Sequence, residues 1–181
     1  MKTSKLVDSA RYFATHAHGR INQERKYTGG PYIRHPERVA ALVATVPHTP
    51  EMLAAAWLHD TVEDTGVTLE EVEAKFGARV ADLVRCLTDC EKSTGDREAR
   101  KATDRERLAL APAEAQTVKL ADLIDNTESI VQYDPKFAVT YLREKALLLK
   151  VLTKGDATLH EQAETILLAA AEELDIDLDA S

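Results

Sequence analysis

Apolar residues recur every three or four positions along most of this chain, the spacing expected of one face of an α-helix. The pattern is clear in residues 4–18, 78–89 and 112–131. Aromatic residues make up only 5% of the chain, while alanine and leucine are abundant, which favours helix over sheet. We find no internal repeat, low-complexity segment or linker. The pattern predicts an all-α fold in one domain, residues 1–181, as a helical bundle of about eight to ten helices.

Capping residues divide this pattern into separate helices. Thr49, followed by proline, is predicted to cap a third helix, and Thr68 begins a capping box. Asp134, also followed by proline, is predicted to cap a helix that ends at Gly155. Asp156 then opens the last helix. The connections between these helices are therefore expected to be short.

Two segments interrupt the helical pattern. Residues 19–34 contain the sequence YTGGP, which cannot continue a helix and predicts a loop. Pro36 suits the first turn of the next helix, so His35 is expected at or near its N-cap. Residues 91–107 are dense in charge and poor in apolar side chains, and we expect a mobile loop leading into a polar helix.

Composition excludes some classes of function. The net charge is −8 with no basic tail, which disfavours binding to DNA or RNA, because such binding depends on neutralising phosphates. No apolar run reaches the length of a membrane span, and residues 1–5 are not followed by the apolar segment of a signal peptide. We therefore expect a cytoplasmic protein that contacts neither membrane nor nucleic acid. A small anionic ligand remains possible.

The most informative residues are His59 and Asp60, followed one helical turn later by Glu63 and Asp64. If the third helix continues to about residues 65–66, all four side chains share one solvent-facing side. Such a cluster is costly to bury unless positive charge neutralises it, and a divalent cation is the simplest candidate. His35 and Asp122 would complete its ligands.

Each proposed ligand also has a simpler interpretation when taken alone. His35 is explained as a helix cap, His59 as a core histidine, and Asp122 as an exposed acid. Asp122, however, stands between apolar pairs of residues, where a buried carboxylate needs a partner. Imidazole and carboxylate ligands together suit Mn²⁺, Fe²⁺ or Zn²⁺ better than Mg²⁺ or Ca²⁺. The joint pattern therefore favours a metal-dependent hydrolase.

The neighbouring acids and bases suggest how such a site would work. Glu63 and Asp64 are close like charges, so the pKa of one should rise toward neutrality and permit proton transfer. Their alternative interpretation is an acidic helix C-terminus, which the helix dipole disfavours. A substrate with several phosphates would need basic side chains, and the candidates are Arg20, Arg25, Lys26, Arg97, Arg100, Lys101, Arg105 and Lys119, with Arg143 and Lys145 weaker. For residues 97–105 a solvated charged face is an equal alternative.

Three segments resemble the motifs of HD-domain (p)ppGpp hydrolases, in the order of that family. They are RKYTGGPYIRHP at residues 25–36, LHDTVEDT at residues 58–65, and VKLAD at residues 118–122 with Asn126. The extension of the His-Asp pair by Glu-Asp-Thr is typical of this branch rather than of HD phosphohydrolases at large. The chain is similar to the stand-alone small alarmone hydrolases, or MESH1-like proteins, and too short to carry the synthetase domain of RelA/SpoT enzymes.

The resemblance implies a role for each matched residue. It implies one metal ion, usually Mn²⁺, with four ligands: His35, His59, Asp60 and Asp122. It implies that Glu63 and Asp64 position and deprotonate the attacking water. Arg25 and Lys26 would contact the nucleotide, with Lys119 as a further basic contact, and Asn126 would reach the ribose or base. Asp125 departs from the family, since the long enzymes often have histidine there.

The leading hypothesis is a Mn²⁺-dependent guanosine-3′,5′-bis(diphosphate) 3′-pyrophosphohydrolase, which converts (p)ppGpp to GDP or GTP and pyrophosphate. An alternative keeps the site and changes the substrate to ppApp or to the 2′-phosphate of NADPH. A third is a non-catalytic nucleotide-binding regulator, which should have lost a ligand or the Glu-Asp pair. The sequence leaves the base preference and the oligomeric state open.

Overall fold

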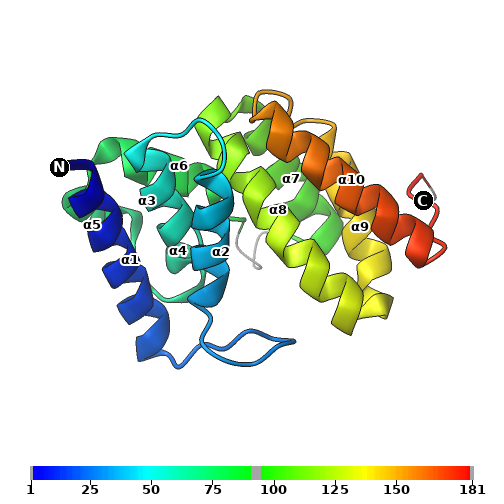
Figure 1. Ribbon diagram of the computed structural model, residues 1–181, viewed down its shortest axis with the longest axis horizontal. Coiled ribbons are helices and arrows are strands. Elements are labelled where there is room, and N and C mark those ends of the chain that lie inside the picture. The colour runs from blue at the N-terminus through cyan, green and yellow to red at the C-terminus, as the bar shows by residue number, and fades with distance from the viewer. Residues whose placement is uncertain (1, 91–94, 180–181) are drawn as a thin grey trace. The chain divides into compact units, whose positions relative to one another are not determined.

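The computed structural model describes residues 2–90 and 95–179 and confirms the all-α prediction (Figure 1). The contacts divide the chain into two compact units, Met1–Asp89 and Cys90–Ser181. Each unit is described by itself, and the single-domain expectation stays a prediction. In the described part of the chain, no helix combines the length and apolarity needed to cross a membrane.

The first unit is built around a short apolar helix. Its described residues form α1 (Lys2–Arg20), α2 (Arg34–Val43), α3 (Pro50–Leu58), α4 (Thr61–Asp64), α5 (Leu69–Phe76) and α6 (Ala78–Leu87). Helix α3 is mostly buried and contacts α1, α2 and α6, with α1 and α2 on either side of it in Figure 1. Helix α3 therefore forms the centre of the core of this unit, up to its last residue, Leu58.

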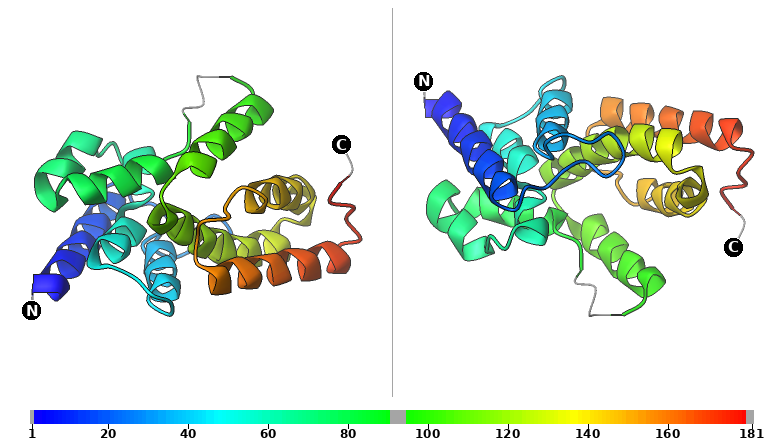
Figure 2. Two further views of the ribbon diagram at one scale, coloured as in Figure 1. Left: turned by 90° about the horizontal axis from the view of Figure 1, so that it is seen from above. Right: turned by 90° about the horizontal axis from the view of Figure 1, so that it is seen from below.

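The second unit consists of longer helices. Its described residues form α7 (Arg97–Leu110), α8 (Ala113–Tyr133), α9 (Pro135–Leu149) and α10 (Ala157–Glu173). Helices α8, α9 and α10 contact one another and run side by side in both views of Figure 2. Most residues of α8 are buried, including several polar ones.

The predicted caps agree with the structure, while some boundaries differ. Thr49 and Thr68 each accept a backbone N–H three residues ahead, and Asp134 and Asp156 cap α9 and α10. Helix α9, predicted to reach Gly155, ends at Leu149. The charged stretch does lead into a polar helix, α7, while residues 91–94 of the predicted loop lie outside the described residues.

The turn between α9 and α10 is fastened to α8 by buried polar groups. The backbone N–H groups of Lys154 and Gly155 donate to Gln116 Oε1, at 2.8 and 3.2 Å, and Asp156 N–H donates to Thr117 Oγ1 at 2.9 Å. A Cβ atom on Gly155 would stand 2.7 Å from a methyl carbon of Leu120. This close approach explains why glycine occupies the position.

A lysine is buried where α9 packs on α8. Lys145 exposes 1% of its surface, and its Nζ donates to Thr127 Oγ1 at 2.8 Å. Burial lowers the pKa of Lys145 from 10.5 to about 7. The weak sequence-based suggestion that Lys145 faces the cleft as a phosphate contact is wrong, because its amine is buried inside this unit.

Candidate active site

Three of the predicted metal ligands converge in the first unit. His35 Nε2 and His59 Nε2 lie 3.2 Å apart, and Asp60 Oδ2 lies 3.5 and 3.1 Å from them respectively. Both histidines are buried, at 1% and 3% exposure, while Asp60 is half-buried. Within the described residues, this trio is a group of side chains whose donor atoms could hold a metal ion together.

The geometry of the trio fits a divalent transition-metal ion. Ligand atoms that each bond one ion at about 2.1 Å stand roughly 3.0–3.4 Å apart at bond angles of about 90–110°. His59 Nδ1 donates to the carbonyl of Ala56 at 2.8 Å, so the neutral ring carries its lone pair on Nε2, toward His35. The Tyr32 hydroxyl donates to Asp60 Oδ2 at 2.6 Å and fixes that carboxylate.

The helix carrying the His-Asp pair is interrupted, contrary to the prediction of one continuous helix through residue 65. Helix α3 ends at Leu58, His59 and Asp60 form a turn, and α4 is a separate helix of four residues. Thr61 Oγ1 donates to the Leu58 carbonyl at 2.7 Å and satisfies it at the break. His59 is buried rather than solvent-facing. Glu63 and Asp64 lie in the first turn of α4 rather than at the C-terminus of a long helix, so the unfavourable helix dipole expected from the sequence does not apply to them.

Glu63 and Asp64 follow the trio on α4, and the surrounding protein changes their acidity. Desolvation, together with the negative charges of Asp89, Asp60 and Asp64, raises the pKa of Glu63 to about 7, although Glu63 is an exposed residue. The Asp89 N–H donates to Glu63 Oε2 at 3.2 Å and opposes this rise. Desolvation also raises the pKa of Asp64. A bound cation would oppose both shifts.

The loop before α2 presents the predicted nucleotide contacts in a fixed turn. Arg25 N–H donates to the Gly30 carbonyl at 3.0 Å, and Gly29 N–H donates to the Arg25 carbonyl at 3.1 Å. Both glycines have positive φ angles, +66° and +75°, which the turn requires. Lys26 is exposed, and its amine lies 2.9 Å from the Tyr27 hydroxyl. His35 follows in the first turn of α2, close to its predicted place.

The remaining predicted residues belong to the second unit and are described there. Asp122 is buried on α8, where Lys119 Nζ pairs with its Oδ2 at 2.9 Å and Asn126 Nδ2 donates to its Oδ1 at 2.7 Å. The structure therefore groups Asp122, Lys119 and Asn126. Sequence reasoning missed that Lys119, three residues earlier on the same helix, is one of the partners that a buried Asp122 needs.

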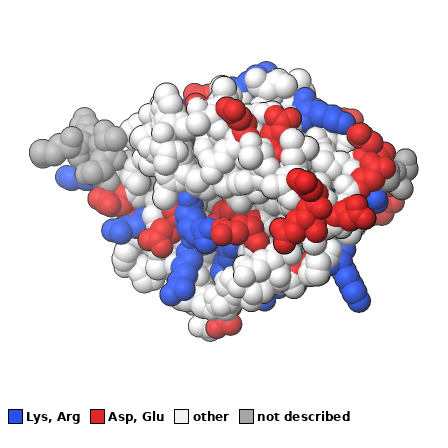
Figure 3. Space-filling view, turned by 45° about the vertical axis from the view of Figure 1, so that its right-hand side comes forward, with Lys and Arg blue, Asp and Glu red and all other residues white. Residues whose placement is uncertain are grey.

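Two of the basic candidates, Arg97 and Arg143, form hydrogen bonds within the second unit. Arg97 forms two hydrogen bonds to Glu144, at 2.6 and 2.8 Å, and Arg143 Nε donates to the Asp177 carbonyl at 3.0 Å. The face drawn in Figure 3 mixes acidic and basic side chains rather than gathering the bases in one patch.

Comparison with known proteins identifies the family of this chain. The model of the HD domain family matches residues 10–151. The chain belongs to the HD domain family. MESH1 of Mus musculus, named a guanosine-3′,5′-bis(diphosphate) 3′-pyrophosphohydrolase, is 38% identical over 136 residues, or 74% of each chain. MESH1 of Danio rerio is 32% identical over 177 residues, covering 92% of this chain and 94% of that protein.

Two further similarities extend this picture of the HD domain. A solved structure of a metazoan SpoT orthologue, described as hydrolysing ppGpp and acting in starvation responses, matches with a TM-score of 0.80 at 29% identity. The match covers 91% of this chain and 94% of that one. The pyrophosphohydrolase of Aquifex aeolicus is 39% identical over 127 residues. The chain spans only 18% and 17% of the length of this protein and of its Synechocystis counterpart.

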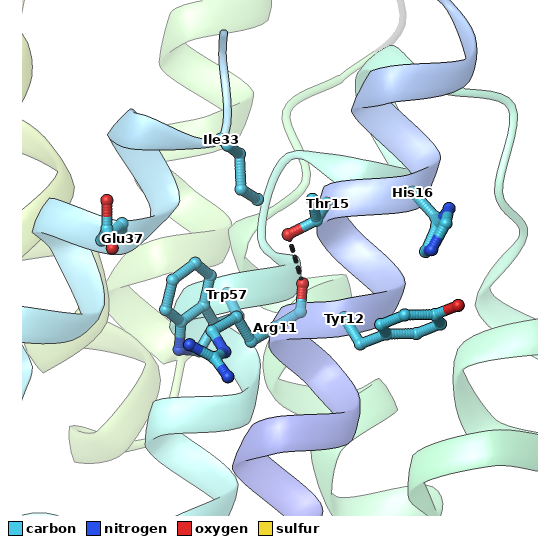
Figure 4. Close-up of a pocket in the computed structure, with 7 residues that line it drawn as sticks. All are labelled: Arg11, Tyr12, Thr15, His16, Ile33, Glu37 and Trp57. Carbon is cyan, nitrogen blue, oxygen red and sulfur yellow. Dashed lines mark hydrogen bonds between the residues drawn. The ribbon is translucent and has the colours of Figure 1, made fainter.

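The HD domain also carries a groove that is separate from the trio (Figure 4). Its volume is about 320 Å³, and it is lined by Arg11, Tyr12, Thr15, His16, Ile33, Glu37 and Trp57. The lining includes neither the trio nor Glu63 and Asp64. The trio and these acids therefore remain the candidate active site.

Two contributors to this site were missed by sequence reasoning. Gln23 Nε2 donates to Asp64 Oδ2 at 2.9 Å, and His18 Nδ1 lies 2.6 Å from Gln23 Oε1. Forty-one positions separate Gln23 from Asp64, so no local pattern reveals the contact. The sequence signal for this contact was His18, which stands just before the loop and at the end of the apolar pattern of residues 4–18.

Proposed function

We propose that this HD domain is a metal-dependent 3′-pyrophosphohydrolase of guanosine 3′,5′-bis(diphosphate), ppGpp. The observation that carries the proposal is the convergence of His35 Nε2, His59 Nε2 and Asp60 Oδ2 within hydrogen-bonding distance of one another. It is supported by the similarity to MESH1 proteins along nearly the whole chain. The acid pair expected to be lost in a non-catalytic regulator is retained. We further propose that the reaction takes place in the cytoplasm.

The proposed ligands of the ion are the trio and, from the family resemblance, Asp122. Two imidazole nitrogens with carboxylate oxygens suit Mn²⁺, Fe²⁺ or Zn²⁺, and we propose Mn²⁺. A divalent cation held there supplies positive charge that favours deprotonation of water and offsets charge on a phosphoryl oxygen. The Ala56 carbonyl and the Tyr32 hydroxyl hold His59 and Asp60 in orientation for binding it.

Glu63 and Asp64 are the proposed acid–base groups. The surrounding protein raises the pKa of Glu63 toward neutrality, and a carboxyl with a raised pKa can both accept and release a proton near neutral pH, which fits Glu63 for this work. Oε2 of Glu63 is held by the Asp89 N–H, so the proton would be exchanged at Oε1. Water attacks the phosphorus attached to the 3′ oxygen, the bond to that oxygen breaks, and a proton reaches the departing 3′ oxygen. The products are GDP and pyrophosphate.

The proposed substrate contacts are Arg25 and Lys26 on the loop, with Lys119 and Asn126. Arg25 and Lys26 carry positive charge on a loop whose backbone is held by hydrogen bonds, which favours orienting the negatively charged phosphates of the substrate. Because phosphate contacts do not distinguish bases, the guanine preference rests on the similarity to MESH1 proteins.

A product assay tests the proposal. The protein is stripped of metal, reloaded separately with Mn²⁺, Zn²⁺ or Mg²⁺, and given ppGpp, pppGpp, ppApp or NADPH. We expect pyrophosphate from ppGpp with Mn²⁺, carrying ¹⁸O when the reaction is run in H₂¹⁸O. Inorganic phosphate as the sole product would point to a phosphomonoesterase, and much faster turnover of ppApp would overturn the guanine assignment.

A further inference from the structure

A chain of hydrogen bonds joins the end of α1 to the acid pair. Asp64 Oδ2 accepts from Gln23 Nε2 at 2.9 Å, and Gln23 Oε1 lies 2.6 Å from Nδ1 of His18. His18 is buried at 1% exposure, whereas Asp64 reaches solvent. Gln23 therefore bridges a rigid histidine in the core and an acid at the surface.

The backbone of Gln23 is fixed on both sides. Its N–H donates to the His18 carbonyl at 3.1 Å, and its carbonyl accepts from the Tyr32 N–H at 2.9 Å. The position of the amide is thus set by α1 and by the far end of the loop. Only rotation of the side chain remains free, and the two side-chain contacts remove that freedom.

The direction of the hydrogen bonds follows from the chemistry of the groups. An ionised Asp64 carboxylate only accepts, so the amide of Gln23 must turn its NH₂ group to Asp64 and its oxygen to His18. His18 Nδ1 must then carry the proton that it donates to that oxygen. Burial lowers the pKa of His18, which favours the neutral ring. Its Nε2 is buried and has no hydrogen-bond partner among the described residues, so the donor role at Nδ1 fixes the tautomer.

The same histidine also supports the residue that holds Asp60. The rings of His18 and Tyr32 have centroids 4.9 Å apart, and the Tyr32 hydroxyl donates to Asp60 Oδ2. Two side chains of the loop therefore contact α4 and its N-cap. Tyr32 contacts Asp60, a proposed ligand, and Gln23 contacts Asp64, a proposed acid. Both rest on His18.

We propose that Gln23 is a positioning residue for hydrolysis: its amide, oriented by His18, holds the Asp64 carboxylate in its working orientation. This inference rests on the proposed function, since it assumes that Asp64 takes part in catalysis. Gln23 lies two residues before Arg25, so a nucleotide bound to the loop would also restrain this amide. Binding of substrate and orientation of the acid are thereby connected through one side chain.

The first experiment replaces Gln23 by leucine, which keeps the size and removes both hydrogen bonds. We expect kcat for pyrophosphate release from ppGpp to fall by about tenfold to 100-fold, the scale of a misplaced catalytic group, with KM changed less than threefold. Gln162→Leu is the matched control, since Gln162 is an exposed glutamine on α10, and its kcat should match the wild type. Should Gln23→Leu fail to fold, Gln23→Glu keeps the shape, loses the donor and should lower kcat at least as much.

A double-mutant cycle separates positioning from a general structural effect. If Gln23 acts through Asp64, adding Gln23→Leu to Asp64→Asn should change kcat less than twofold. A fall of equal size in both backgrounds would mean that Gln23 acts elsewhere, and would overturn the inference.

His18 offers a rescue experiment. His18→Leu removes the donor to Gln23 and should lower kcat as Gln23→Leu does. His18→Asn places an amide N–H near the position of Nδ1 and should recover most of the loss. Equal activity of the two variants would contradict the assigned role of the Nδ1 proton.

The outcomes distinguish this inference from the proposed function. No pyrophosphate from the wild-type protein would overturn the proposed function itself. Pyrophosphate release with full activity of Asp64→Asn would leave that function standing, but would remove Asp64 from catalysis and overturn the positioning role with it. Loss of activity in Asp64→Asn with wild-type kcat in both Gln23 variants would sink only the positioning role.

Discussion

Replacing Lys145 by methionine should stabilise the protein at pH 8. The side chain is buried against α8, where its amine has a hydrogen bond to Thr127 Oγ1. Methionine retains the length of the carbon stem and removes the group that must be deprotonated on folding. The Thr127 hydroxyl still donates to the Leu123 carbonyl at 2.5 Å, so it keeps a partner.

The size of the effect follows from the pKa of Lys145, which burial lowers from 10.5 to about 7. Because the folded-state pKa is the lower one, the unfolded chain binds more protons between pH 7 and 10.5, and stability rises with pH across that window. At pH 8 the cost of deprotonation is about 3 kcal/mol, and at pH 10 it is about 1 kcal/mol. The lost hydrogen bond costs about 1 kcal/mol. Lys145→Met should therefore gain about 2 kcal/mol at pH 8 and nothing at pH 10.

Urea unfolding followed by circular dichroism measures this difference at both pH values. Lys136→Met is the matched control, because Lys136 is an exposed lysine on the same helix. Its effect on the free energy of unfolding should be small and independent of pH. The reasoning is refuted if Lys145→Met is less stable than the wild type at pH 8. It is equally refuted if the gain is the same at pH 8 and pH 10.

Three further predictions concern the site and the packing. His59→Ala should abolish both metal retention, measured by elemental analysis after dialysis, and turnover. Glu63→Gln should retain the metal but lower kcat by about 10²-fold or more, whereas the exposed Glu73→Gln should not; unchanged kcat would remove Glu63 from proton transfer. Gly155→Ala should destabilise the protein by about 1–3 kcal/mol in urea unfolding, because its Cβ would crowd α8. Gly19→Ala, with nothing within 4 Å of the new Cβ, should not destabilise it.

The sequence predicted best what depends on local chemistry. Thr49, Thr68 and Asp156 each cap a helix through a contact two or three residues away, so their role is visible in the order of residues alone. The trio was also anticipated, because His59 and Asp60 are adjacent and His35 lies beside a recognisable helix start. Whether these residues bind a metal ion stays a prediction.

What the sequence did not predict depends on contacts across the fold. The helix break at Asp60 leaves no mark in the periodicity, since helical spacing continues on both sides of it. Gln23 looks like an ordinary loop residue until the fold brings Asp64 to it. Lys145 was a weak candidate to face the cleft and contact phosphate, whereas the leucines at positions 142 and 149 of α9 place it on the buried face. The spacing of apolar residues along α9 was the better guide to the position of Lys145.

The position of Trp57 gives the protein a built-in optical probe. It is the chain's single tryptophan, it lies on α3 two residues before His59, and it is 8% exposed. Its emission therefore reports on the unit Met1–Asp89, while the far-ultraviolet dichroism averages over the helices of both units. If the two signals change at the same urea concentration, the two units unfold together. Separate midpoints mean that each unit can unfold alone.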